Sequence, residues 1–289
     1  MDAGIVLAVL SMLAFGLNGG VSKKVVKNLG PLKYALYRNI ALTFVLAILC
    51  AVNYSGLNFD IRYILYALVI SVFIYIGFFV SNKAIQKGRL GIVLPITSSR
   101  IMITTLLASV ILKETLYPSQ YLLILMIIGG IVTLSVDFKD LKRFDINGKG
   151  IKEAMIAAAI FGITMTFYGE IGKVIGPYLL GLMVEGVILV GTIIQLIISK
   201  EAMRLSVYEK KTYSLSLILI AIFSGLGVYF SNLAYVSGSV SIITAILAAS
   251  PIVTTLYDRF IHKEVMNLQE NFGTMIIFAG IIVLSLTKS

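Results

Sequence analysis

Long apolar stretches alternate with short polar connectors along the whole chain. A helix needs about 20 mostly apolar residues to cross about 30 Å of hydrocarbon, and ten stretches approach that length. They cover residues 3–22, 34–52, 63–82, 90–112, 119–136, 151–169, 178–198, 213–236, 240–260 and 271–286. The pattern predicts an all-α membrane protein with ten transmembrane helices.

The composition supports a membrane location. Of the 289 residues, 58% are hydrophobic and 13% are charged, whereas a soluble domain carries about 25% charged residues. The mean hydropathy of +0.98 likewise excludes a water-soluble fold. The single cysteine, Cys50, excludes an internal disulfide framework, and the single histidine, His262, argues against a His/Cys metal site. We therefore expect no metal and no cofactor, and a multi-pass location in the cell membrane.

The net charge of +10 arises from Lys and Arg in the connectors, where they set membrane topology, so nucleic-acid binding is not expected. The connectors after the first, third, fifth, seventh and ninth stretches hold 19 Lys and Arg residues, Arg38 included, and the other side holds 4. Cytoplasmic connectors carry the excess of these residues. The count therefore places both termini outside the cell.

The chain also contains an internal repeat. A shift of 150 residues aligns residues 80–136 with 230–286 without a gap, and a shift of 146 aligns the earlier part. Matched positions include Asn82/Asn232, Thr104/Thr254, Lys27/Lys173 and Gly30-Pro31/Gly176-Pro177. We expect two five-helix units, residues 1–137 and 148–289, joined by a linker at 138–147. Because five is odd, the two units must cross the membrane in opposite senses.

Such inverted-topology repeats favour a transport function. They are the architecture of many secondary transporters, because exchanging the conformations of the two repeats turns an outward-open cavity inward. The sequence has no Gly-x4-Gly-Lys-Ser/Thr loop, so ATP is not expected to drive transport within this chain. The architecture raises the expectation of transport without identifying a substrate.

Short motifs add to this picture. They are Phe15-Gly16-Leu17-Asn18-x4-Lys23, the pairs Lys113-Glu114 and Lys263-Glu264, and Pro251. With the ten stretches and the repeat, they resemble the drug/metabolite transporter superfamily, and within it the proteins built from two EamA domains. Phe15 replaces the family's Trp, and the proline of the fourth stretch is Pro95 instead of a residue at position 101. The resemblance covers nearly the whole chain and implies a transporter with cytoplasmic termini, opposite to the charge count.

Arg100 is the sharpest candidate for substrate binding. It lies about ten residues, or roughly 15 Å, from either end of the fourth stretch, where an arginine facing lipid costs about 2.5 to 3.5 kcal/mol. Thr97 and Thr104 share its helical face. A guanidinium in a wet cavity suits a substrate carboxylate or phosphate. The alternative is an internal ion pair that locks the bundle.

Glu185, in the seventh stretch, is a proton-coupling candidate, because an ionisable carboxylate at this depth can exchange protons during transport. The alternatives are a permanent ion pair with Arg100 or simple hydration near the interface. The aligned residue in the other half is Asn39, so the acid is not duplicated.

Further candidates for substrate contacts are amides and tyrosines. Asn18, Asn82 and Asn232 offer donors and acceptors, and Tyr75 and Tyr229 share helical faces with the last two amides. Such faces suit an amphipathic metabolite. Equally, interhelical hydrogen bonds from these amides would hold the bundle together.

Two prolines are hinge candidates. Pro95 and Pro251 remove backbone hydrogen bonds within their stretches, which predicts a kink in each helix. Each kink either serves as a hinge or only bends the helix to fit its neighbours.

The sequence therefore favours a secondary transporter that moves a small metabolite, such as an amino acid or another carboxylate, through a central cavity. The alternatives are an efflux carrier for lipophilic or cationic drugs anchored at Glu185, or a channel. An intramembrane enzyme is not expected, because the sequence has no Gly-x-Ser-x-Gly elbow and no clustered acids. The expected partners are a small-molecule substrate and membrane lipids, and the chain would act as a monomer or a homodimer.

Overall fold

The computed structural model describes residues 3–87, 93, 96–135, 150–261, 263 and 268–286, and over these residues the secondary structure is helical, with no strand. In the first half lie α1 (Ala3–Leu29), α2 (Pro31–Val52), the 3-10 turn Tyr54–Gly56, α3 (Ile61–Lys87), α5 (Arg100–Ile111) and α6 (Pro118–Ser135). In the second half lie α8 (Ile151–Ile175), α9 (Pro177–Ser199), α10 (Val207–Ser237), α11 (Val240–Ala248), α12 (Pro251–Ile261) and α13 (Leu268–Leu286). The linker predicted at 138–147 and the two boundaries beside it lie outside the described residues.

Seven of these helical segments are long and apolar enough to cross a membrane, among them the combined segment Val240–Ile261. Three shorter apolar helices, Ile96–Ile111, Pro118–Thr133 and Asn271–Leu284, lie within the other three stretches. The expected all-helical membrane architecture is therefore confirmed over the described residues.

Two glycine–proline steps begin equivalent helices of the two halves. Gly30 and Gly176 have φ angles of 82° and 93°, a backbone region that residues with a side chain rarely adopt. Each is followed by the first residue of a helix, Pro31 in α2 and Pro177 in α9, where the missing N–H of proline costs no helical hydrogen bond. The same local sequence thus reverses the chain in the same way twice.

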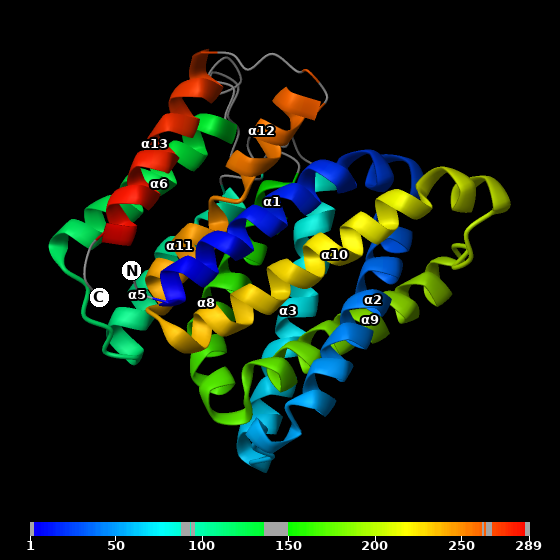
Figure 1. Cartoon of the computed structure of the whole chain (residues 1–289), viewed down its shortest axis with the longest axis horizontal. Helices are drawn as coiled ribbons and strands as arrows, with labels where there is room; N and C mark the ends of the chain where they lie inside the picture. The colour runs from blue at the N-terminus through cyan, green and yellow to red at the C-terminus, as the bar shows by residue number, and fades with distance from the viewer. Residues whose placement is uncertain are drawn as a thin grey trace.

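The two halves interlock instead of folding side by side (Figure 1). Helix α1 packs along α10, and α3 packs along α8, although each pair joins different halves. Helices α2 and α9 pack on each other, and so do α6 and α13. The halves therefore share one core, which contains buried residues of both, such as Met12, Ile101, Ile175 and Ile243.

Individual contacts across this interface occur in matching pairs. Gly16 lies against Ser250 and Val253, and its carbonyl accepts a hydrogen bond of 2.9 Å from the Thr254 hydroxyl. In the other half Gly162 lies against Arg100 and Ile103, and its carbonyl accepts a bond of 3.1 Å from the Thr104 hydroxyl. These residues are equivalent under the shifts of 146 and 150 residues found in the sequence. Each glycine contacts the opposite half in the same manner.

The helical segments that hold Arg100 and Pro251 are both interrupted. Ser99 forms a turn immediately before α5, and Ala249 and Ser250 form a turn between α11 and α12. The two turns align under the shift of 150 residues. Pro251 is the first residue of α12, so a break between two helices replaces the kink expected within one. Pro95 lies outside the described residues.

Candidate functional site

Arg38 and Glu185 form an ion pair inside the helical bundle. The Nη1 atom of Arg38 lies 3.2 Å from Oε2 of Glu185, and the two side chains are only 14% and 8% exposed. Arg38 belongs to α2, so counting it as a connector residue was wrong. Of the alternatives for Glu185, a permanent ion pair does form, but its partner is Arg38 instead of Arg100.

The local sequence explains how this pair forms. Glu185 of α9 aligns with Asn39 of α2, the residue next to Arg38, and these two equivalent helices pack on each other. Arg38 also donates from Nη1 to Oδ1 of Asn39 at 2.6 Å and from Nε to Oγ of Ser224 at 3.2 Å. A buried ion pair depends on further hydrogen bonds to its charged groups, and α2 and α10 supply them for Arg38.

Arg100 is the first residue of α5 and lies at the break in its helical segment. Its guanidinium carbon is 5.6 Å from the centre of the Phe161 ring of α8, within the range of a cation–π interaction. Tyr235 of α10 lies in its vicinity. Among the described residues, no carboxylate pairs with Arg100. The Arg100 side chain thus lies partly buried in the bundle, over an aromatic ring of the other half.

A buried polar cluster extends from Tyr235. The Tyr235 hydroxyl is 3.1 Å from that of Thr244, and its ring lies 5.4 Å from the ring of Tyr168. Tyr168 in turn donates to Oδ1 of Asn232 at 2.8 Å. The Nδ2 atom of Asn232 packs against Gly181 and has no hydrogen-bond partner among the described residues. The cluster therefore contains two tyrosine hydroxyls engaged in hydrogen bonds and one buried amide donor without a partner among the described residues.

The other candidate polar residues lie in different local environments. Asn18 donates from Nδ2 to the Tyr34 hydroxyl at 3.3 Å, while its Oδ1 is buried without a partner among the described residues. Thr97 donates to the carbonyl of Val93 at 2.9 Å, within its own helical segment. Asn82 lies half-buried near the end of α3. Asn18 and Asn82 are thus not part of the cluster around Arg100.

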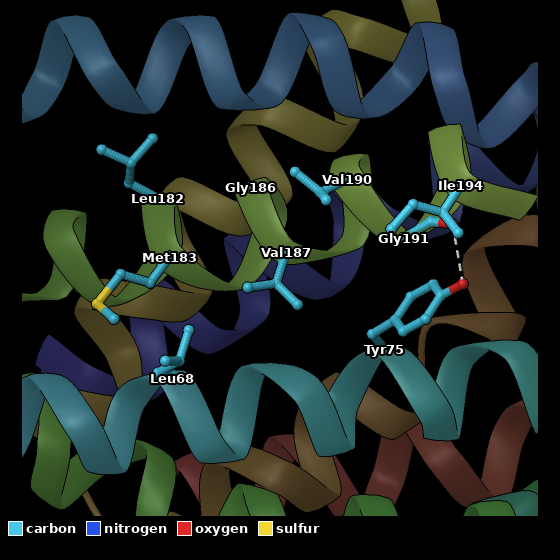
Figure 2. A pocket seen from close by; sticks show the side chains of 9 residues that line it. All are labelled: Leu68, Tyr75, Leu182, Met183, Gly186, Val187, Val190, Gly191 and Ile194. Carbon is cyan, nitrogen blue, oxygen red and sulfur yellow. Dashed lines mark hydrogen bonds between the residues drawn. The ribbon is translucent and has the colours of Figure 1, made fainter.

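The two candidate tyrosines also lie apart from that cluster. Tyr75 donates to the carbonyl of Gly191 at 3.0 Å and lines an apolar groove of about 420 Å³ between α3 and α9 (Figure 2). The groove is lined by Leu68, Tyr75, Leu182, Met183, Gly186, Val187, Val190, Gly191 and Ile194. Tyr229 stacks on Tyr178, with ring centres 5.9 Å apart.

Sequence reasoning missed three parts of the polar core. Tyr168 and Tyr235 carried no distinctive spacing, because tyrosine is common throughout the chain. The role of the Lys113-Glu114 motif was also not foreseen. Glu114 accepts hydrogen bonds from the backbone N–H and the hydroxyl of Ser241, in the first turn of α11. Lys113 has a φ angle of 53° and thereby turns the chain so that Glu114 reaches the opposite half.

Comparisons with known proteins agree with this architecture. The model of the EamA-like transporter family matches residues 2–136 and again residues 148–286. An uncharacterised protein of Methanocaldococcus jannaschii is 32% identical over 137 residues, which cover 47% of this chain and 98% of that relative. That relative is therefore about as long as one of the two matched repeats.

A solved structure shows the same fold. A protein crystal structure superimposes with a TM-score of 0.79 at 13% identity, and the match covers 99% of each chain. Likeness at this identity concerns the fold alone. Membership follows from the two sequence matches, which together span nearly all of the chain: the protein belongs to the EamA-like transporter family, a family of membrane transporters.

Proposed function

We propose that the protein is a secondary transporter of small carboxylates, such as amino acids, and that Arg100 binds the carboxylate group. The observation that carries this proposal is a partly buried guanidinium that lies over the Phe161 ring and has no acidic partner among the described residues. A charge in such a place costs free energy unless a counter-charge is present. A transported anion supplies that counter-charge.

The neighbours of Arg100 support a small polar substrate. The Tyr168 and Tyr235 hydroxyls are engaged with Asn232 and Thr244, whereas Asn232 provides an amide donor that no described residue accepts. Donors of this kind favour a second acceptor on the substrate, such as a carbonyl or another carboxylate oxygen. The substrate class therefore combines one anionic group with one further polar group.

We infer that transport proceeds by alternating access between two inverted five-helix repeats with ten membrane spans. The matched contacts of Gly16 and Gly162 support two equivalent halves, and the turns at Ser99 and Ala249–Ser250 support discontinuous helices at the site. Discontinuous helices at the interface of two repeats surround the substrate in many secondary transporters. Pro251, at the start of α12, would act as a hinge there. The cell membrane is the proposed location.

Glu185 fits a different role from that of a cation anchor. Its carboxylate is held by Arg38, so a lipophilic cation would have to displace a guanidinium that has three hydrogen-bond partners. This arrangement favours the carboxylate transporter over the drug-efflux alternative. Proton coupling through Glu185 would require the ion pair to open during the transport cycle.

Uptake into liposomes tests the proposal. The purified protein is reconstituted and challenged with a panel of radiolabelled amino acids and dicarboxylates under a proton gradient. For a transported carboxylate, Arg100→Gln should lower uptake at limiting substrate by about 10- to 100-fold, the size of a lost hydrogen bond to a charged group. Arg100→Lys should retain part of the activity, because it keeps the charge without the fork geometry.

Arg62→Gln is the matched control. Arg62 is exposed at the start of α3, so its replacement should leave uptake unchanged. Carboxylate uptake that survives Arg100→Gln at the wild-type level would remove Arg100 from the site. Uptake of lipophilic cations alone would overturn the substrate class.

A further inference from the structure

An open surface cavity of about 820 Å³, with both polar and apolar lining, lies at one end of the bundle, away from the Arg100 cluster. Its wall is formed by the end of α1, the start of α2, the connector between α9 and α10, and the first turns of α10. The charged and polar side chains in this wall are Asn28, Lys33, Arg204, Ser206, Tyr208, Glu209 and Tyr213. The transport proposal assigns no role to this cavity.

The connector that forms one side of the cavity is fixed in place. The Tyr37 hydroxyl donates to the carbonyl of Met203 at 3.2 Å and accepts from the backbone N–H of Leu205 at 3.3 Å. Ser206 then caps α10, with its hydroxyl accepting from the N–H of Glu209 at 3.1 Å. Tyr37 belongs to α2, so the connector is held against the other half of the chain. The cavity is therefore a preformed feature of the fold.

The single acid in the wall is already satisfied. Oε1 of Glu209 accepts from Nζ of Lys33 at 2.9 Å, and Oε2 accepts from the backbone N–H of Ser206 at 2.6 Å. Arg204 is exposed and forms no ion pair with any described residue. Lys33 neutralises Glu209, so Arg204 leaves the wall with a net positive charge. Its fork of donors suits a phosphate group.

The second half of the chain has apolar residues at the positions equivalent to Asn28 and Lys33. The shift of 146 residues places Val174 at the position of Asn28 and Leu179 at the position of Lys33. Both of these apolar residues pack against the main core. The basic cavity is therefore a specific feature of one membrane face, the face that carries most of the Lys and Arg of the connectors. The cytoplasmic leaflet, which faces such connectors, is rich in anionic phospholipids.

We propose that this cavity binds a phosphate-bearing anion, with Arg204 as its main ionic contact. The phosphate can belong to the head group of an anionic phospholipid or to a soluble molecule. Tyr208 and Tyr213 supply hydroxyls at the cavity wall, and Asn28 supplies an amide. The cavity volume accommodates a head group as well as free phosphate.

The test is a thermal-unfolding titration of the full-length protein in phosphatidylcholine nanodiscs. In one series the fraction of phosphatidylglycerol in the nanodiscs is increased. In the other, inorganic phosphate is added to nanodiscs that contain only phosphatidylcholine. A ligand that binds the folded state raises the melting temperature. Arg204→Gln should raise about fivefold the half-saturating amount of whichever ligand stabilises the wild type. One basic residue near the membrane surface contributes about 1 kcal/mol to the binding free energy of an anionic lipid.

Arg204→Lys should restore most of the binding, and Arg62→Gln, an exposed arginine outside the cavity, should behave as the wild type. Stabilisation by phosphatidylglycerol alone assigns the site to a lipid head group, and stabilisation by inorganic phosphate assigns it to a soluble phosphate. Equal half-saturation in the wild type and in Arg204→Gln would overturn the proposal. So would the absence of stabilisation by either ligand in the wild type.

Discussion

Arg38 of α2 and Glu185 of α9 join the two halves of the chain through a buried ion pair of 3.2 Å. The two helices occupy equivalent places in the repeat, and Glu185 aligns with Asn39, the neighbour of Arg38. One half therefore contributes the cation and the other half the anion at the contact between equivalent helices. Arg38 aligns with Val184 and Glu185 with Asn39, so the pair occurs once and is not repeated by the symmetry of the halves.

Breaking this pair should destabilise the protein strongly. Arg38→Met or Glu185→Met alone leaves the remaining charge buried without its partner, and should lower the free energy of unfolding by about 3 to 5 kcal/mol. The double variant removes both charges and should recover most of that loss. Unfolding in detergent, analysed as a double-mutant cycle, measures the coupling.

The exposed pair of Lys173 and Glu170 serves as the control. Both side chains are nearly half exposed, at 45% and 44%, so removal of either should cost less than about 1 kcal/mol. Strictly additive losses for Arg38→Met and Glu185→Met would show that the buried pair does not join the halves energetically.

The close glycine contacts offer a second prediction. A Cβ atom on Gly16 would lie 2.7 Å from the carbonyl oxygen of Ser250, and one on Gly162 would lie 2.6 Å from Cβ of Ile103. Gly16→Ala and Gly162→Ala should therefore each cost about 1 to 3 kcal/mol through overpacking. Gly129→Ala, in α6 where nothing lies within 4 Å, should be neutral or stabilising. The yield of monodisperse protein after heating reports these differences, and equal tolerance at all three glycines would contradict the close packing.

Much of the fold could be predicted because its signals are local or repeated. Apolar stretches indicate membrane helices, and the Gly30-Pro31 and Gly176-Pro177 steps mark equivalent helix starts in both halves. Even the interlocking of the halves has a sequence correlate, since the glycines and threonines that form it recur at fixed shifts. The repeated positions thus indicated contacts between the two halves, which the pattern within a single helix could not indicate.

The candidate site was less predictable, because its partners depend on which helices pack. Arg38 was counted with the connector residues beside Lys33, whereas its side chain turns from α2 into the bundle and pairs with Glu185. Arg100 was recognised from its depth alone, but its aromatic neighbours, Phe161 and Tyr235, come from the other half. The hydrophobic pattern of one stretch does not indicate which residues of the other half will contact it.

Glu114 provides a third prediction, about the start of α11. Its carboxylate accepts from the N–H and the hydroxyl of Ser241, which satisfies a donor in the first turn of that helix. Glu114→Ala should lower the free energy of unfolding by about 1 kcal/mol, the usual cost of a lost helix cap. Glu201→Ala, at an exposed position of the α9–α10 connector, should have no such effect. Ser241→Ala combined with Glu114→Ala should add little to the single loss, and full additivity in thermal unfolding would refute the contact.

Membrane orientation gives a fourth prediction, which separates the charge count from the family resemblance. Moving Arg38 out of the connectors leaves the excess of Lys and Arg on the same face, so the positive-inside rule still places both termini outside. Cys50 is the only cysteine and is buried, so single introduced cysteines can be labelled with little background. In intact cells a membrane-impermeant thiol reagent should label Ser55→Cys, in the connector after α2, and should leave Lys211→Cys unlabelled until the cells are opened. The reverse pattern would place the termini in the cytoplasm. It would also put the basic cavity beside Arg204 on the outer face, where the argument from the anionic inner leaflet no longer applies.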